Sequence, residues 1–229
     1  MRLKNNLSIK SQLKQYEQLG FSNLELKEIE KGLAKEVDVS CYAYQKFAHY
    51  QMAAIREGLE KGIHPSLYLD ITESPRTIQA LVDGFEKNID LREYVQQGFE
   101  GAQLDYIYKG LLHNVDISKF AKLHYTPGMM HRVVDGLIDG IDISNYADKD
   151  YGGLVLMHVL RAVKKGYDPQ YLLNNEFNAK QLYLISDGLR LGLDVSQYAD
   201  PSVPFTEMRI IKSKLFNDKL RGDANEIDK

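Results

Sequence analysis

The sequence predicts an all-α protein, an α-solenoid of about seven to eight two-helix repeats that are 26 residues long. The first observation is a polar residue that recurs every 26 residues, at what we call position 0: Asp38, His64, Asp90, Asp116, Asp142, Asp168 and Asp194. The second is a large residue at position +4: Tyr42, Tyr68, Tyr94, Phe120, Tyr146, Leu172 and Tyr198. The third is a small residue at position −6: Gly32, Gly58, Gly84, Gly110, Gly136, Ala162 and Gly188.

Each repeat is predicted to begin with a long helix, from about position −15 to −3. Apolar residues at positions −12, −9 and −5 lie on one helical stripe, for example Leu104, Ile107 and Leu111. Position −16 carries residues that favour N-caps: Ser22, Ser74, Thr126 and Asn178. Position −2 carries residues that favour helix ends: Gly62, Asn88, Asn114, Gly140, Gly166 and Gly192. An eighth helix around Glu207–Leu215 is expected to close the array.

A second, short helix is predicted to start at position 0. Aspartate is a good N-cap, and Pro65 and Pro169 at position +1 suit a first helical turn. The aromatic residue at position +4 would then bury the short helix against the long one. The aspartates are therefore interpreted as caps rather than as catalytic carboxylates.

The small residue at position −6 falls in the middle of the long helix. Glycine there costs about 1 kcal/mol relative to alanine, so a specific reason for it is expected. Ala162 occupies one of these positions, so the requirement is for a small residue and not for a positive φ. Close approach of neighbouring long helices is the predicted reason.

The domain organisation follows from the repeat. Residues 1–20 fit it weakly, with Leu13 and Tyr16 on apolar positions, and are interpreted as an N-terminal cap with one short helix. Residues 21–215 form the solenoid. Residues 216–229 have no apolar stripe and are predicted to be a flexible C-terminal tail.

Composition narrows the classes of protein and compartment. Cys41 is the only cysteine, which rules out an intramolecular disulfide and favours a reducing, cytoplasmic location. Residues 1–14 lack the apolar segment of a signal peptide, and no run of 18 apolar residues suggests a membrane span. The net charge of −3 argues against broad nucleic-acid binding, and residues 83–150, with 12 acidic and 7 basic side chains, could meet a basic partner.

Motifs for catalysis or cofactor binding are missing from the sequence, so we expect a non-enzymatic protein without a cofactor. There is no phosphate-binding glycine loop, nucleophile elbow or His-Glu-x-x-His pattern. A metal site that joins His131 and His158 with Asp105 or Asp135 is a less favoured alternative.

Candidate partner-binding residues lie at positions −11 and −10 of the later repeats. They have the composition of interface hot spots: Tyr106, His131, Arg132, His158, Tyr183 and Leu184. Tyr106, Arg132, His158 and Leu184 are expected to be the most exposed. The alternative is that position −11, which lies on a flank of the long helix, packs laterally against the next long helix. Position −7 alternates in charge from Asp83 to Asp187, which predicts a ladder of ion pairs between neighbouring repeats.

Two segments, Gln51–Gly62 and Gly188–Pro201, resemble short helical repeats with a Gln-Met-x-x-Ile-Arg-x-Gly-Leu core that occur in phage and conjugative-element proteins of Gram-positive bacteria. The resemblance extends in degenerate form over residues 21–215. It implies a mobile-element setting, in which a small protein of this kind is often an inhibitor of host defence, such as an anti-CRISPR. It carries over no catalytic residue.

The sequence therefore favours a protein-binding solenoid that inhibits by occupying a surface of its partner, with a basic nucleic-acid-binding effector as the candidate partner. The alternatives are a helical-repeat protein that binds nucleic acid directly, and a structural or oligomerisation module. An enzyme is the least favoured class.

Overall fold

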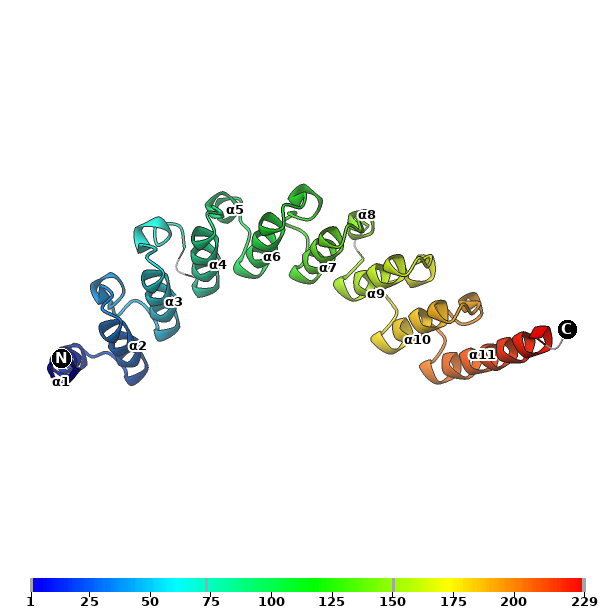
Figure 1. The fold of residues 1–229 in the computed structure, drawn as a ribbon, viewed down its shortest axis with the longest axis horizontal. Helices are drawn as coiled ribbons and strands as arrows, with labels where there is room; N and C mark the ends of the chain where they lie inside the picture. The colour runs from blue at the N-terminus through cyan, green and yellow to red at the C-terminus, as the bar shows by residue number, and fades with distance from the viewer. Residues whose placement is uncertain (1, 73, 150, 228–229) are drawn as a thin grey trace. The chain divides into compact units, whose positions relative to one another are not determined.

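The computed structural model describes residues 2–72, 74–149 and 151–227, and within these ranges the chain is helical and contains no strand (Figure 1). The chain divides into two compact units, Met1–Tyr108 and Lys109–Lys229. The division falls inside one helix, α6 (Gly101–Leu112). The prediction of an all-α, repeat-like fold is confirmed at this level.

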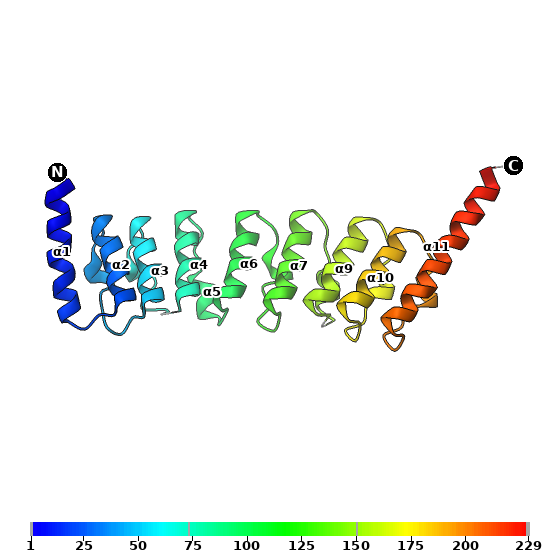
Figure 2. The same ribbon diagram turned by 90° about the horizontal axis from the view of Figure 1, so that it is seen from below.

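The first unit is a row of helices in which each long helix packs against the next one in the chain, α1 on α2, α2 on α3 and α3 on α4 (Figure 2). Short elements connect them on one side. The elements are α1 (Arg2–Gln18), α2 (Asn23–Ala34), the 3₁₀ turn η1 (Val39–Cys41), α3 (His49–Glu60), the 3₁₀ turn η2 (Pro65–Leu67), α4 (Pro75–Glu86) and α5 (Arg92–Gln96).

The second unit repeats this plan, with α7 packed on α9, α9 on α10 and α10 on α11. Its elements after α6 are the 3₁₀ turn η3 (Ile117–Lys119), α7 (Pro127–Ile138), α8 (Ser144–Ala147), α9 (Gly153–Lys164), the 3₁₀ turns η4 (Gln170–Leu172) and η5 (Val195–Gln197) on either side of α10 (Ala179–Arg190), and α11 (Phe205–Ile227).

The long helices match the predicted limits closely. Seven of them, α2, α3, α4, α6, α7, α9 and α10, are 12 residues long and run from position −15 to −4. Ser22, Thr126 and Asn178 accept the expected capping hydrogen bonds, whereas Ser74 precedes α4 without a side-chain cap. Local sequence therefore sets where these helices begin.

The helix ends also follow the prediction, with one addition. All six predicted Gly and Asn residues at position −2 have positive φ, including Asn88 at +59° and Asn114 at +55°. Glu36 occupies the same position after α2 and has φ +59°, although a glutamate is disfavoured there. The geometry of the turn is therefore kept even where the residue does not favour it.

The short elements are mostly 3₁₀ turns, with brief α-helices at α5 and α8. Before α5, α8 and η4 the N-cap is the residue after the predicted aspartate, namely Leu91, Ile143 and Pro169. The capping role of position 0 is confirmed in the other repeats, because Asp38, Asp116 and Asp194 each accept a hydrogen bond from the backbone N–H two residues later, at 3.0 to 3.2 Å. His64 makes the same contact, since its Nδ1 accepts from the Ser66 N–H at 3.2 Å. Hydrogen bonds from the serine hydroxyls keep the pKa of these three carboxyls below the ordinary value for aspartate.

The predicted apolar stripe forms the core. Side chains at positions −12 and −9 are fully buried in the inner repeats, as in Met52 and Ile55 or Leu182 and Ile185. Residues at position −5 are only half-buried. The aromatic residues at position +4 take up the remaining core space, and Tyr42, Tyr68, Phe120 and Tyr198 are buried.

The predicted reason for the glycines at position −6 is wrong. A Cβ on Gly188 would overlap the hydroxyl of Tyr198, and a Cβ on Gly110 would lie 2.6 Å from Cζ of Phe120. At Gly32, Gly58, Gly110 and Gly188 the nearest group is thus the aromatic side chain of the same repeat, whereas at Gly84 and Gly136 it is the backbone oxygen of Ile89 or Ile141. Side chains of the next long helix come second, as with Leu160 Cδ1 at 3.2 Å from a Cβ on Gly136.

Both ends of the chain are more helical than predicted. The N-terminal segment is one 17-residue helix, α1, instead of a single short helix. Residues 216–227, predicted as a flexible tail, continue α11, and residues 228–229 lie outside the described part.

Candidate binding surface

The six sequence-predicted binding residues differ strongly in exposure. Tyr183 on α10 is 61% exposed, whereas His158 and Leu184 retain only 3% and 5% of their accessible surface. The half-buried members are Tyr106, His131 and Arg132. The expectation that His158 and Leu184 are among the most exposed is therefore wrong. Tyr106 belongs to the first unit, and the other five belong to the second.

The burial of position −10 has a simple geometric cause. It faces position −8 of the next long helix, 28 residues later in the chain. Glu28 on α2 accepts from Nε of Arg56 on α3 at 3.1 Å, and both side chains are buried. His158 Nδ1 and Ser186 Oγ make the equivalent contact between α9 and α10, at 2.6 Å. Lateral packing was expected at position −11, and the structure instead places it at position −10, while Tyr183 at position −11 stays exposed.

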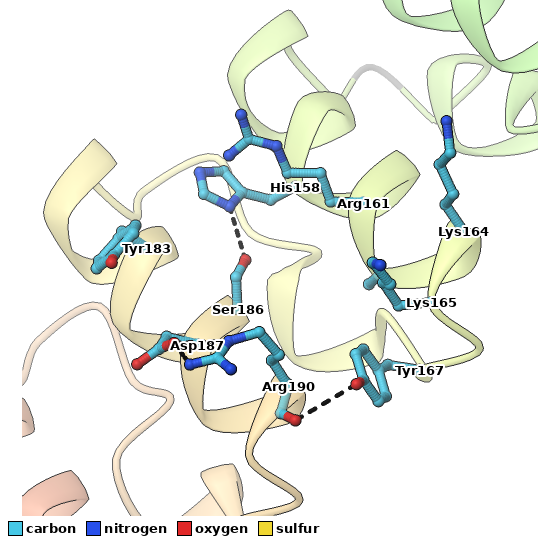
Figure 3. Close-up of a pocket in the computed structure, with 10 residues that line it drawn as sticks. His158, Arg161, Lys164, Lys165, Tyr167, Tyr183, Ser186, Asp187 and Arg190 are labelled. Atoms are coloured by element: carbon cyan, nitrogen blue, oxygen red, sulfur yellow. Dashed lines mark hydrogen bonds and ion pairs between the residues drawn. The ribbon is translucent and has the colours of Figure 1, made fainter.

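A pocket of about 370 Å³ opens beside this contact, between α9 and α10 (Figure 3). The α9 side and its following turn supply six lining residues: His158, Arg161, Ala162, Lys164, Lys165 and Tyr167. The α10 side supplies four: Tyr183, Ser186, Asp187 and Arg190. Of the predicted binding residues, only His158 and Tyr183 line this pocket.

His158 is neutral at physiological pH in this setting. Burial between the two helices, together with the nearby charge of Arg161, lowers its pKa to about 4. In the part of the chain that the structure describes, no group of three or more His, Cys, Asp or Glu side chains could hold a metal ion. His131 is engaged elsewhere, since its Nε2 lies 3.1 Å from Asp135.

The carboxylates near the pocket are engaged by other cations. Asp187 pairs with Arg190 at 2.6 Å and also with Lys212 of α11. Asp139 pairs with Lys164 at 2.7 Å. Of the predicted ladder at position −7, the pair Lys109–Asp135 forms at 2.6 Å.

Arg161 departs from that predicted ladder. Within the described residues it forms an ion pair with neither Asp135 nor Asp187, and Lys165 likewise forms no ion pair. Both side chains are exposed. Neither residue was among the predicted binding residues, because the alternation of charge at position −7 suggested that Arg161 would be neutralised.

Two tyrosines flank the pocket. Tyr167 is half-buried, and its hydroxyl donates to the backbone oxygen of Arg190 at 3.3 Å, which fixes the ring at the end of α9 (Figure 3). Tyr183 projects from α10 and stays exposed. Arg161 and Lys164 also line a second hollow of about 420 Å³ on the α7 side, so the surface extends across three helices of this unit.

Cys41 does not have the environment of a catalytic thiol. Its Sγ lies 3.9 Å from Nε2 of His64 and 3.7 Å from Oδ2 of Asp38. Burial and the neighbouring carboxylate raise the pKa of the thiol, which opposes formation of the nucleophilic thiolate.

Comparison of the chain with known proteins found no matching family model, curated protein or solved structure. Among the described residues, the helices are too short or too polar to cross a lipid bilayer.

Proposed function

We propose that this protein is a non-enzymatic binding protein that uses the long-helix surface of its second unit to hold a segment of another protein. The observation that carries the proposal is the α9–α10 pocket, which is lined by the exposed residue Tyr183 together with Arg161 and Lys165, two cations without an ion pair among the described residues. Tyrosine and arginine are enriched among the residues that dominate binding energy at protein interfaces.

The proposal includes a single α-solenoid of seven to eight repeats as the scaffold. Its support is the constant register: the long helices α2 to α10 begin 26 residues apart, and α11 begins 26 residues after α10. Repeat arrays of this kind present extended surfaces for binding.

The proposal also includes the biological role. The protein would act in the bacterial cytoplasm as an inhibitor from a mobile element, comparable to an anti-CRISPR, and would block a host defence protein by steric occupancy. The support for this part is the resemblance of Gln51–Gly62 and Gly188–Pro201 to mobile-element repeats.

Direct nucleic-acid binding is the second candidate, favoured by the same two unpaired cations. Binding of this kind depends on several phosphate contacts and weakens steeply with salt. The carboxylates of Asp135, Asp139 and Asp187 lie on the helices next to Arg161 or on the pocket wall itself. They already pair with Lys109, Lys164 and Arg190, so among the described pocket residues Arg161 and Lys165 alone would be left for phosphate contacts.

The test is a capture experiment with a matched pair of variants. The tagged protein captures partners from lysate of a host bacterium, and each captured protein is then measured against Tyr183→Ala and Tyr50→Ala. Both tyrosines are exposed, at 61% and 56%, but Tyr50 lies on α3, away from the pocket residues in the sequence and in the other unit.

Tyr183→Ala is expected to weaken the interaction at least tenfold, about 1.4 kcal/mol, whereas Tyr50→Ala leaves it unchanged. Equal binding by both variants would remove the α9–α10 surface from the proposal. Tight, salt-sensitive binding of single-stranded DNA in a gel shift would favour the second candidate.

A further inference from the structure

The α9–α10 pocket carries more positive charge than its own residues neutralise. Four of its lining residues are basic, namely Arg161, Lys164, Lys165 and Arg190, and Asp187 is the acidic one. Arg190 is paired with Asp187, and Lys164 is paired with Asp139. Arg161 and Lys165 remain without an ion pair among the described residues, and both come from the α9 side of the pocket.

The chain does not supply the missing anion from within the pocket. The carboxylate of Asp187 already accepts from Arg190 through Oδ1 and from Lys212 through Oδ2. Its pKa is held below the ordinary value, with these two cations opposing the effect of burial. A third cation therefore gains little from Asp187, so Arg161 and Lys165 remain available to an external carboxylate that enters the pocket they line.

The volume of the pocket limits the size of the group that it can bind. A volume of about 370 Å³ lies at the low end of the range of roughly 300–1,000 Å³ that is typical of small-ligand sites. The pocket therefore has room for one or two side chains of a peptide. The rings of Tyr167 and Tyr183 line it and supply apolar surface for the aliphatic part of such a side chain (Figure 3).

We propose that the α9–α10 pocket binds an acidic segment of the partner protein and holds a glutamate or aspartate carboxylate between Arg161 and Lys165. This inference rests on the proposed function and names the chemistry of the bound segment. The planar guanidinium of Arg161 matches a carboxylate with two parallel hydrogen bonds, and Lys165 adds a second positive charge. A free phosphate or a nucleic acid lacks the aliphatic arm that the two tyrosines would contact.

The test uses the full-length protein and four defined probes. Hexaglutamate, hexalysine, inorganic phosphate and hexathymidylate are titrated separately at near-physiological ionic strength, while NMR follows the ring signals of Tyr167, Tyr183 and His158. Hexaglutamate is expected to shift these signals in a saturable way, and hexalysine is expected to leave them unchanged. A bound carboxylate would also raise the pKa of His158, which gives a second readout.

A pair of charge-matched variants then locates the site. Arg161→Gln with Lys165→Gln removes the two unpaired cations, whereas Lys149→Gln with Lys214→Gln removes two exposed lysines elsewhere in the same unit. The first variant is expected to weaken hexaglutamate binding at least tenfold. The second variant has the same net charge as the first but keeps Arg161 and Lys165. It is therefore expected to change hexaglutamate binding less than twofold.

Three results would overturn the inference: no saturable shift with hexaglutamate, equal losses in the two double variants, or tighter binding of phosphate or hexathymidylate than of hexaglutamate. If the inference fails while Tyr183→Ala still weakens the captured partner, the proposed function stands and only the acidic segment is wrong. If the partner is insensitive to Tyr183→Ala while hexaglutamate binds, the site is an acidic-peptide site that the partner does not use.

Discussion

The phenol ring of Tyr198 occupies the space above Gly188 in the middle of α10. A Cβ on Gly188 would overlap the Tyr198 hydroxyl, which donates to the backbone oxygen of Leu184 at 3.2 Å. The chain contains its own counterexample at the preceding repeat. There Ala162 replaces the glycine and Leu172 replaces the aromatic residue, and both are buried. The two positions therefore form one packing unit.

We predict that Gly188→Ala destabilises the protein by about 1–3 kcal/mol, because the ring of Tyr198 must move. Adding Tyr198→Leu, which copies the Ala162–Leu172 pair, should recover part of this loss, so the double variant is more stable than the sum of the single changes implies. Urea denaturation measures the cycle. Gly128→Ala is the control, since its Cβ would have no neighbour closer than 3.8 Å, and it should be neutral or stabilising.

Glu36 provides a second prediction, on backbone conformation. It has φ +59°, which costs an ordinary residue about 1–2 kcal/mol relative to glycine. Glu36→Asn should therefore stabilise the protein by about 0.5–1 kcal/mol, since asparagine tolerates this region better. The reciprocal change, Asn88→Glu at the same φ, should destabilise by a similar amount in the same denaturation assay. The explanation requires that the change in unfolding free energy has opposite signs in the two variants.

The N-caps give a matched pair for a third prediction. Asn178 accepts hydrogen bonds from the N–H groups of Lys180 and Gln181, whereas the side chain of Ser74 makes no such bond. Asn178→Ala should cost about 1 kcal/mol. Ser74→Ala should stay within about 0.5 kcal/mol, as expected for a surface change. Thermal melts followed by circular dichroism test both, and a cost for Ser74→Ala equal to that of Asn178→Ala would contradict the assignment.

A fourth prediction concerns pH. The pKa of His158 is lowered to about 4 in the folded state, from about 6.5 in an unfolded chain. Between these values the unfolded state binds more protons, so stability is complete above pH 6.5 and falls as the pH drops towards 4. Arg161 on α9 adds to this effect, and Ser186 on α10 holds Nδ1.

His158→Leu should flatten the dependence of unfolding free energy on pH in this window. Some slope should remain, because the pKa of His131 is also lowered by burial. An unchanged slope in His158→Leu, measured by urea denaturation at several pH values, would show that His158 does not contribute.

The sequence predicted the features that depend on a few neighbouring residues. Caps such as Asn178, the turns at Asn88 and Asn114, and the buried stripe through Met52 and Ile55 are set by local spacing, so periodicity was enough. The fold class and the limits of the long helices followed from them.

The prediction failed where the neighbouring helix decides the outcome. The face of α9 that holds His158 was identified, but the rotation of α10 that buries it could not be known from one helix alone. The reason for Gly188 required the position of the Tyr198 ring. That Arg161 and Lys165 lack an ion pair could be recognised only from the structure, in which Asp187 pairs with Arg190 and Lys212.

The lateral contact between Glu28 and Arg56 has a consequence for how this chain can evolve. The repeats share one length and one register, so exchanging or duplicating them looks simple in the sequence. If α4 followed α2 directly, the carboxylate of Glu28 would face Val82, the residue equivalent to Arg56. Glu28 would keep its ion pair with Lys31 on α2 but would lose the buried hydrogen bond from Arg56, which destabilises the contact. The order of the repeats is therefore constrained by buried contacts between neighbouring long helices. Recombination within the gene is tolerated only where it keeps these contacts.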